Sequence, residues 1–169
     1  MKKPTKTIAF MGLFTALALI MAYIEILIPP LFPSIPGIKM GLPNIIIVFL
    51  LYRRGIGSAI CVSLLRMVMV MMLFGNVMAF LYSLAGGFLS LSVMILLRRM
   101  NFLSVVGVSV AGGVMHNVGQ ILMAILLLDT TEIGYYLVVL IVTGVIAGVF
   151  VGLCGATLIK KIPKNTMLF

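Results

Sequence analysis

The chain has 169 residues, of which 63% are hydrophobic and 9% are charged, and its mean hydropathy is +1.34. This composition excludes an ordinary soluble domain, and we predict a single-domain, all-α integral membrane protein. The formal net charge is +9, but the basic residues stand in pairs and triplets at the ends of apolar runs, which indicates membrane topology rather than nucleic-acid binding.

Six apolar segments divide the chain, and we expect each to be a transmembrane helix. The first is long enough to span a membrane and no cleavage site follows it, so we expect it to be retained rather than removed as a signal peptide. The second offers only about nine apolar residues. Because about twenty are needed to cross the hydrocarbon core, it must be short, tilted or shielded. The expected spans are roughly 8–28, 43–52, 56–74, 77–97, 103–127 and 133–159.

Lysine and arginine accumulate in the cytoplasmic loops of membrane proteins, so their positions test the number of spans. Ten of the twelve lie before the first span, between the second and third, between the fourth and fifth, or after the sixth. The acidic link 129–132 and the connection 29–43 fall on the other side. We therefore expect a six-transmembrane-helix bundle with both termini cytoplasmic, and a cell membrane, the bacterial plasma membrane, as its location.

The connection 29–43 holds five prolines and two glycines and cannot be a continuous helix. Apolar residues within it, such as Phe32 and Ile38, would be poorly placed in water. We expect this outer loop to fold over the outer mouth of the bundle as a lid. A plain connector is the alternative.

Small residues recur at four-residue spacing in three of the expected spans, where they let another helix backbone approach closely. Such stripes are common in membrane helices, so they are stronger evidence for tight internal packing than for a partner protein. The stripes are Gly12 and Ala16, then Ala18 and Ala22, in the first span; Gly86 and Ser90 in the fourth; and Gly144, Gly148, Gly152 and Ala156 in the sixth.

A polar cluster lies within the fifth span, in the sequence GGVMHNVGQ at 112–120. Helical spacing places His116, Asn117 and Gln120 on one face. Polar groups at bilayer depth are costly unless they meet partners, a cavity or a ligand. The cluster therefore predicts the floor of a binding site, with hydrogen bonding between helices as the alternative.

Arg66 lies near the middle of the third span, where an arginine needs a partner. The only carboxylate within a span is Glu25, so the two form a structural pair, or Arg66 contacts a ligand and Glu25 orients it, or both. Nearly all other intramembrane polarity also lies in the outer half, which favours an outward-facing pocket over a pathway through the membrane. The further candidate substrate-binding residues there are Lys39, Asn44, Asn76 and Tyr82. The cations favour a ligand with an anionic or strongly accepting head and an apolar body.

No enzyme motif stands out in the sequence. It has no paired carboxylates, no HExxH, no GxSxG and no phosphate-binding loop. Three acidic residues cannot supply aspartate clusters for Mg²⁺ and diphosphate, and the two cysteines, Cys61 and Cys154, offer neither a disulfide framework nor a metal motif. We predict a non-enzyme with no catalytic residue, no metal site and no cofactor.

The chain resembles the substrate-binding S components of energy-coupling factor transporters. More specifically, TALALIMAYIE at 15–25, GLPNI at 41–45, Arg66 and GGVMHNVGQ at 112–120 resemble the Gx transporter family, whose members are often labelled heptaprenyl diphosphate synthase component I. The resemblance covers nearly the whole chain. It implies capture of a small organic micronutrient or cofactor precursor, together with a transmembrane T subunit and ATPase subunits.

Three functions therefore stand as hypotheses. The leading one is ligand binding for energy-coupled uptake, the second is a noncatalytic membrane subunit in isoprenoid or quinone metabolism, and the third is a self-contained channel or carrier. For the first, we expect a helix of the T subunit to pack on Gly12 and Ala16 near the cytoplasmic side. The alternative is that these two residues seat another helix of the same chain.

Overall fold

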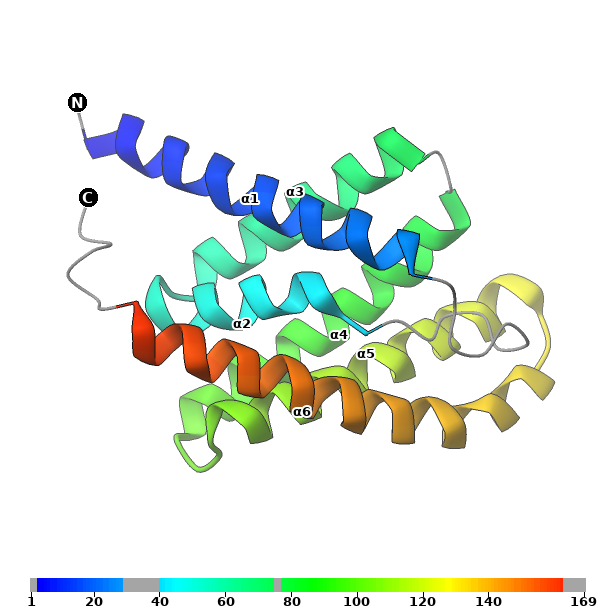
Figure 1. Cartoon of the computed structure of the whole chain (residues 1–169). Helices are drawn as coiled ribbons and strands as arrows, with labels where there is room; N and C mark the ends of the chain where they lie inside the picture. Colours follow the sequence, from blue (N-terminus) through cyan, green and yellow to red (C-terminus); the bar gives the residue numbers. More distant parts are fainter. Residues whose placement is uncertain (1–2, 29–39, 75–76, 163–169) are drawn as a thin grey trace.

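The protein is described by a computed structural model covering residues 3–28, 40–74 and 77–162, and these ranges contain helices and no strand (Figure 1). The predicted all-α class is confirmed, and each of the six expected segments overlaps one α-helix, although the sixth also includes a short 3-10 helix. The helices are α1 (Lys3–Leu27), α2 (Leu42–Arg53), α3 (Ile56–Phe74), α4 (Val77–Met100), α5 (Val105–Leu128), the short 3-10 helix η1 (Glu132–Tyr136) and α6 (Leu137–Lys161).

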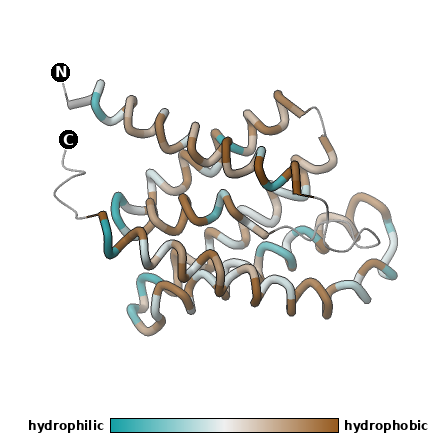
Figure 2. The backbone as a smooth tube through the Cα atoms, in the orientation of Figure 1, coloured by the Kyte–Doolittle hydropathy of each residue, from teal (hydrophilic) through white to brown (hydrophobic). Residues whose placement is uncertain are grey.

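Five of these helices are long and apolar enough to cross a membrane, so the chain has the character of a multi-pass membrane protein. The exception is α2, whose 12 residues extend about 18 Å at 1.5 Å per residue. That length is well short of a hydrocarbon core of about 30 Å. Hydrophobic residues predominate along the helices (Figure 2). Large apolar side chains such as Ile146 and Phe88 are exposed, as expected for surfaces that face lipid.

The helix ends follow local backbone chemistry. The side chain of Ser104 caps α5 by accepting a hydrogen bond from the backbone N–H of Gly107 at 3.2 Å. Asp129 ends the same helix in the left-handed conformation, with φ 48°. Gly41 begins α2 with φ 73°, a conformation that glycine adopts without steric cost, and Pro43 follows in the first turn.

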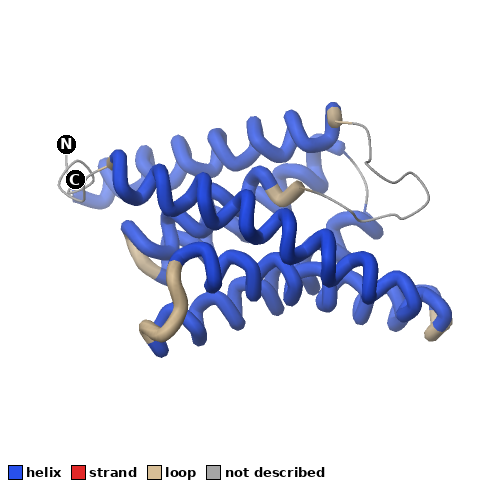
Figure 3. Tube along the Cα trace, turned by 60° about the horizontal axis from the view of Figure 1, so that its bottom comes forward, coloured by secondary structure: helices blue, strands red, loops and turns tan. Residues whose placement is uncertain are grey.

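The six helices lie side by side (Figure 3), and their contacts close into a ring in the order α1, α3, α4, α5, α6, α2 and back to α1. The short α2 also packs on α3, so three helices contact it. Ile47 to Leu51 are at most 1% exposed. The second expected span is thus both short and shielded, which are two of the three possibilities that its few apolar residues allowed. Because α2 fills only part of the bundle's depth, it leaves space beside its N-terminal end.

Glycines bring the backbones of α4, α5 and α6 into direct contact. A Cβ at Gly119 would lie 2.7 Å from the carbonyl oxygen of Ala85 in α4. In α6, a Cβ at Gly148 would lie 2.5 Å from the Cα of Val110, and one at Gly152 would lie 2.7 Å from the Cα of Val106. The small-residue stripe of the sixth span therefore packs against α5, as tight internal packing requires.

Large side chains join α1 to α2. The rings of Phe10 and Phe14 lie 4.4 Å apart, and Phe14 stacks on Phe49 of α2 at 5.6 Å. On the same helix, Gly12 and Ala16 are exposed, and a Cβ added at Gly12 would meet nothing within 4 Å. The described helices therefore do not pack on Gly12.

Basic residues gather at the end of the bundle where α1 begins and α6 ends (Figure 1). The guanidinium of Arg53 donates to the carbonyl of Ile159 near the end of α6. That of Arg54 lies 4.3 Å from the ring centroid of Phe10, and that of Arg98 lies 5.2 Å from the Tyr52 ring. The start of α1, the end of α6 and the α2–α3 and α4–α5 connections thus share one end, and the C-terminal ends of α1 and α3 share the other.

Candidate ligand-binding pocket

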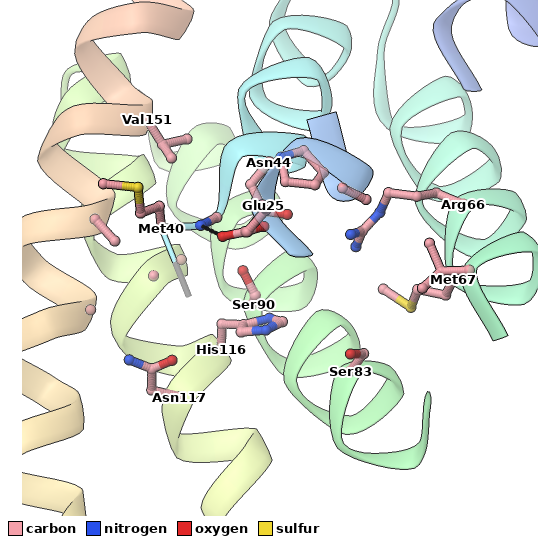
Figure 4. A pocket seen from close by; sticks show the side chains of 18 of the residues that line it. Glu25, Met40, Asn44, Arg66, Met67, Ser83, Ser90, His116, Asn117 and Val151 are labelled. Carbon is pink, nitrogen blue, oxygen red and sulfur yellow. Dashed lines mark hydrogen bonds between the residues drawn. The ribbon is translucent and has the colours of Figure 1, made fainter. Parts of the chain in front are cut away.

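A pocket of about 330 Å³ lies inside the ring, and all six helices contribute to its walls (Figure 4). It begins beside Glu25 and Phe74, near the C-terminal ends of α1 and α3, and reaches Met94 and Ser109 deeper in the bundle. On α2 the lining stops at Val48, and the next three residues, Phe49 to Leu51, are at most 1% exposed. The pocket is therefore a recess next to the short helix.

Charged groups occupy the wall formed by α1 and α3. One carboxylate oxygen of Glu25 accepts a hydrogen bond from the backbone N–H of Gly41, which ties α1 to the start of α2. The guanidinium of Arg66 points into the pocket and interacts electrostatically with Glu25 (Figure 4). The Nε atom of Arg66 is buried and has no hydrogen-bond partner within the described residues.

Neutral polar groups line the opposite wall, formed by α4, α5 and α6. His116 and Asn117 face the pocket from α5, and Ser83 and Ser90 face it from α4 (Figure 4). The side-chain amide of Asn117 also donates to the carbonyl oxygen of Leu140 at 2.5 Å. Asn117 thus joins α5 to α6 while lining the pocket, so it fits both interpretations of the polar cluster.

Flexible and aromatic side chains supply the apolar part of the lining. Met67 and Met71 come from α3, together with Phe74, and Phe80 comes from α4. The Sδ of Met94 lies 2.6 Å from the position of a Cβ at Gly112, so this methionine fills a notch in α5. Methionine adapts its shape readily, and such walls suit an apolar ligand body of irregular shape.

The structure brings together five of the residues expected to bind substrate: Glu25, Asn44, Arg66, His116 and Asn117. Tyr82 and Gln120 are half-buried and do not contribute to the lining. Gln120 instead lies against α4, with its Cγ 3.0 Å from a Cβ position at Gly86, and its Oε1 is buried without a hydrogen-bond partner within the described ranges.

Three expectations fall outside the described residues. They are the substrate contacts of Lys39 and Asn76 and the cover formed by residues 29–39.

Several lining residues were not anticipated, notably Ser90, Ser109 and Met94. A signal for Ser109 was present, because residues 109, 112 and 116 follow helical spacing along one face of α5. Met94 carried no such signal, since methionine is common throughout this chain.

The lining offers several hydrogen-bond donors and acceptors. Within the described part of the chain, no three His, Cys, Asp or Glu side chains gather in one place. The arrangement can hold a small molecule by one charged group, several neutral polar groups and apolar contact.

Comparison with known proteins identifies the family of the chain. Residues 14–158 match the family model described as heptaprenyl diphosphate synthase component I. No curated protein and no solved structure matches the chain. The match covers all six helices in part or whole, so the pocket lies within the matched region.

Proposed function

The chain belongs to the heptaprenyl diphosphate synthase component I family, and we propose that it is a noncatalytic membrane subunit that captures a small organic molecule from the outer face. In this proposal it is the S component of an energy-coupling factor type importer. Its cargo is a micronutrient or cofactor precursor, and a transmembrane T subunit and ATPase subunits complete the transporter.

The recess beside α2 is the observation that carries the proposal. It holds charged and neutral polar groups at bilayer depth, yet the next residues of α2, Phe49 to Leu51, are buried in the core. A channel or self-contained carrier is expected to have polarity through its full depth. A pocket that ends in a packed core suits binding, with release driven by a partner.

The charge distribution supports an orientation for this importer. The end where α1 begins and α6 ends also holds the C-terminal ends of α2 and α4. These helix ends carry Arg53, Arg54, Arg98 and Lys160, and by the positive-inside rule such an end faces the cytoplasm. The pocket then faces outward. In this topology α2 counts as one of six membrane crossings, although it is too short to span the membrane without its neighbours. The location in this proposal is the bacterial plasma membrane.

Reconstitution tests the function directly. The small molecule that copurifies with the protein is identified by mass spectrometry, and its labelled form is offered to liposomes. We expect uptake only when the T subunit and ATPases are included and ATP is present. Uptake by the lone protein would instead establish a carrier, and copurification of no small molecule together with no uptake would overturn the proposal.

The family description and the apolar lining favour one alternative, a noncatalytic subunit of isoprenoid or quinone metabolism. In that case the pocket would hold a prenyl chain and its polar head. Co-reconstitution with the catalytic synthase subunit separates the two. A change in product chain length or turnover that depends on this protein would support the alternative, whereas unchanged synthesis would support uptake.

A further inference from the structure

The carboxylate of Glu25 is committed to the start of α2. Gly41, the residue at the N-cap of α2, provides no side chain for capping, and its backbone N–H donates to Glu25 instead. A helix N-terminus presents unsatisfied N–H groups and a partial positive charge, and both stabilise a nearby carboxylate. Glu25 therefore has a stabilising environment that does not depend on an ion pair with Arg66.

Arg66 is the cation that this arrangement leaves available in the pocket. A guanidinium has five N–H donors, and here the buried Nε–H has no acceptor within the described residues. The side chain points into the cavity and interacts with Glu25 through space (Figure 4). A buried donor without an acceptor is costly, so the site favours a molecule that brings acceptors to it.

Apolar side chains surround this cation. Met67, Met71 and Phe74 lie on the same face of α3 as Arg66, and Phe80 lies opposite on α4. A ligand group that reaches Arg66 must therefore be attached to an apolar body. The volume of about 330 Å³ admits a body of modest size.

We infer that the pocket takes a small amphiphilic organic anion, a carboxylate or an equivalent oxyanion, whose acid group binds Arg66 and whose apolar body lies against Met67, Met71 and Phe80. Glu25 is a tether between α1 and α2 rather than a ligand contact. This inference deepens the proposed function and rests on it only in taking the pocket as the ligand site.

If Glu25 is a tether, its replacement by glutamine should change the affinity for an anion in a definite direction. In Glu25→Gln the side-chain oxygen can still accept from Gly41, but the negative charge near Arg66 is removed. Anion binding then strengthens, by about fivefold for roughly 1 kcal/mol of relieved repulsion. If Glu25 contacted the ligand or was needed to orient Arg66, the same substitution would weaken binding.

The test uses two probes of nearly the same shape, 4-phenylbutyrate and 4-phenylbutyramide, titrated against the full chain in lipid nanodiscs, with empty nanodiscs as the correction for partitioning. Wild type is expected to prefer the carboxylate. Arg66→Met should reduce carboxylate affinity about 10- to 100-fold and remove the preference. Arg66→Lys, which keeps the charge but not the planar fork, should retain a weaker preference.

Three outcomes would overturn the inference: neither probe binding, equal binding of both by wild type, or a preference that survives in Arg66→Met. Weaker carboxylate binding by Glu25→Gln would overturn the tether role. If Arg66→Met does not fold, the preference of wild type for the carboxylate over the amide, together with the titration of Arg66→Lys, still tests the inference. These measurements need no partner subunit, so partner-independent uptake would refute the importer while leaving the ligand class intact.

Discussion

The two halves of the bundle are packed by different means. In α4, α5 and α6, glycines at the crossing points bring main chain against main chain. In α1, α2 and α3, large side chains form the contacts. Phe14 stacks on Phe49, and α2 contacts α1, α3 and α6. The pocket lies between these halves. Its charged groups come from the side-chain-packed half, and most of its neutral polar groups come from the glycine-packed half.

This difference has a consequence for how the halves respond to change. Backbone contacts cannot adjust by rotamer changes, so the glycine-packed half provides a fixed wall for His116 and Asn117. Side-chain contacts can rearrange at lower cost. The half that carries Glu25 and Arg66 is therefore the more adaptable side of the pocket.

The largest expected effect comes from Gly148→Ala. Its new Cβ would lie 2.5 Å from the Cα of Val110 and 2.9 Å from the carbonyl oxygen of Ser109, and neither atom belongs to a side chain that can move away. We expect a loss of about 3 kcal/mol in the free energy of unfolding. Gly12→Ala is the matched control, because its Cβ meets nothing. Equal thermal stability of the two variants in detergent would contradict the backbone-contact description.

A smaller effect is expected from Phe49→Leu in the other half. Phe49 is fully buried and packs on Phe14, but its neighbours are side chains that can rearrange around leucine. We expect a loss of about 1 kcal/mol. Thermal unfolding measured beside Gly148→Ala gives the comparison, and a loss as large as that of the glycine variant would show that both halves are equally rigid.

A still smaller effect is expected when the hydrogen bond between α5 and α6 is removed. Asn117→Leu deletes the donor to the Leu140 carbonyl, and interhelical hydrogen bonds in membrane proteins contribute about 0.6 kcal/mol on average. Thr143→Val is the control, since Thr143 donates to the same carbonyl from within α6 at 3.1 Å. If Asn117→Leu leaves unfolding unchanged but weakens binding of the copurified ligand, Asn117 acts mainly as a ligand contact.

The sequence predicts the fold better than it predicts the site. Hydropathy located all six helices because each apolar run is bounded by charges, glycine or proline. The four-residue spacing in the sixth span also predicted close packing, although only the structure shows α5 as the partner. The sequence does not show how each helix is rotated about its own axis, and therefore which of its faces turns toward the pocket. His116 and Gln120 are four residues apart and both lie against Gly86 of α4, yet His116 also lines the pocket and Gln120 does not.

Depth along the spans could suggest that Arg66 meets Glu25, but not that Glu25 is bound by Gly41. That contact joins residues 16 apart across a proline-rich connection. The deep lining residues Ser90 and Met94 were equally inaccessible from sequence, because they reach the pocket only where α4 crosses α5.

The smallest expected effect on folding, and the largest on assembly, comes from the double variant Gly12→Leu with Ala16→Leu. Both residues are exposed on α1, and a Cβ at Gly12 has open space. Added side chains there should leave the free energy of unfolding within about 0.5 kcal/mol of wild type, as for surface changes in general.

These same residues lie near the basic end of α1, where the importer proposal places a helix of the T subunit. Small residues permit close helix approach in lipid, so two leucines should prevent that contact. We expect the double variant to bind the copurified ligand normally but to fail in copurification with the T subunit and in uptake. The control is Leu13→Ala with Leu17→Ala, which changes exposed positions of the same helix turn without adding bulk. A leucine double variant that still assembles and transports would place the docking surface elsewhere. Loss of ligand binding together with assembly would show instead that this stripe supports the fold, and that the side-chain-packed half is less adaptable than its contacts indicate.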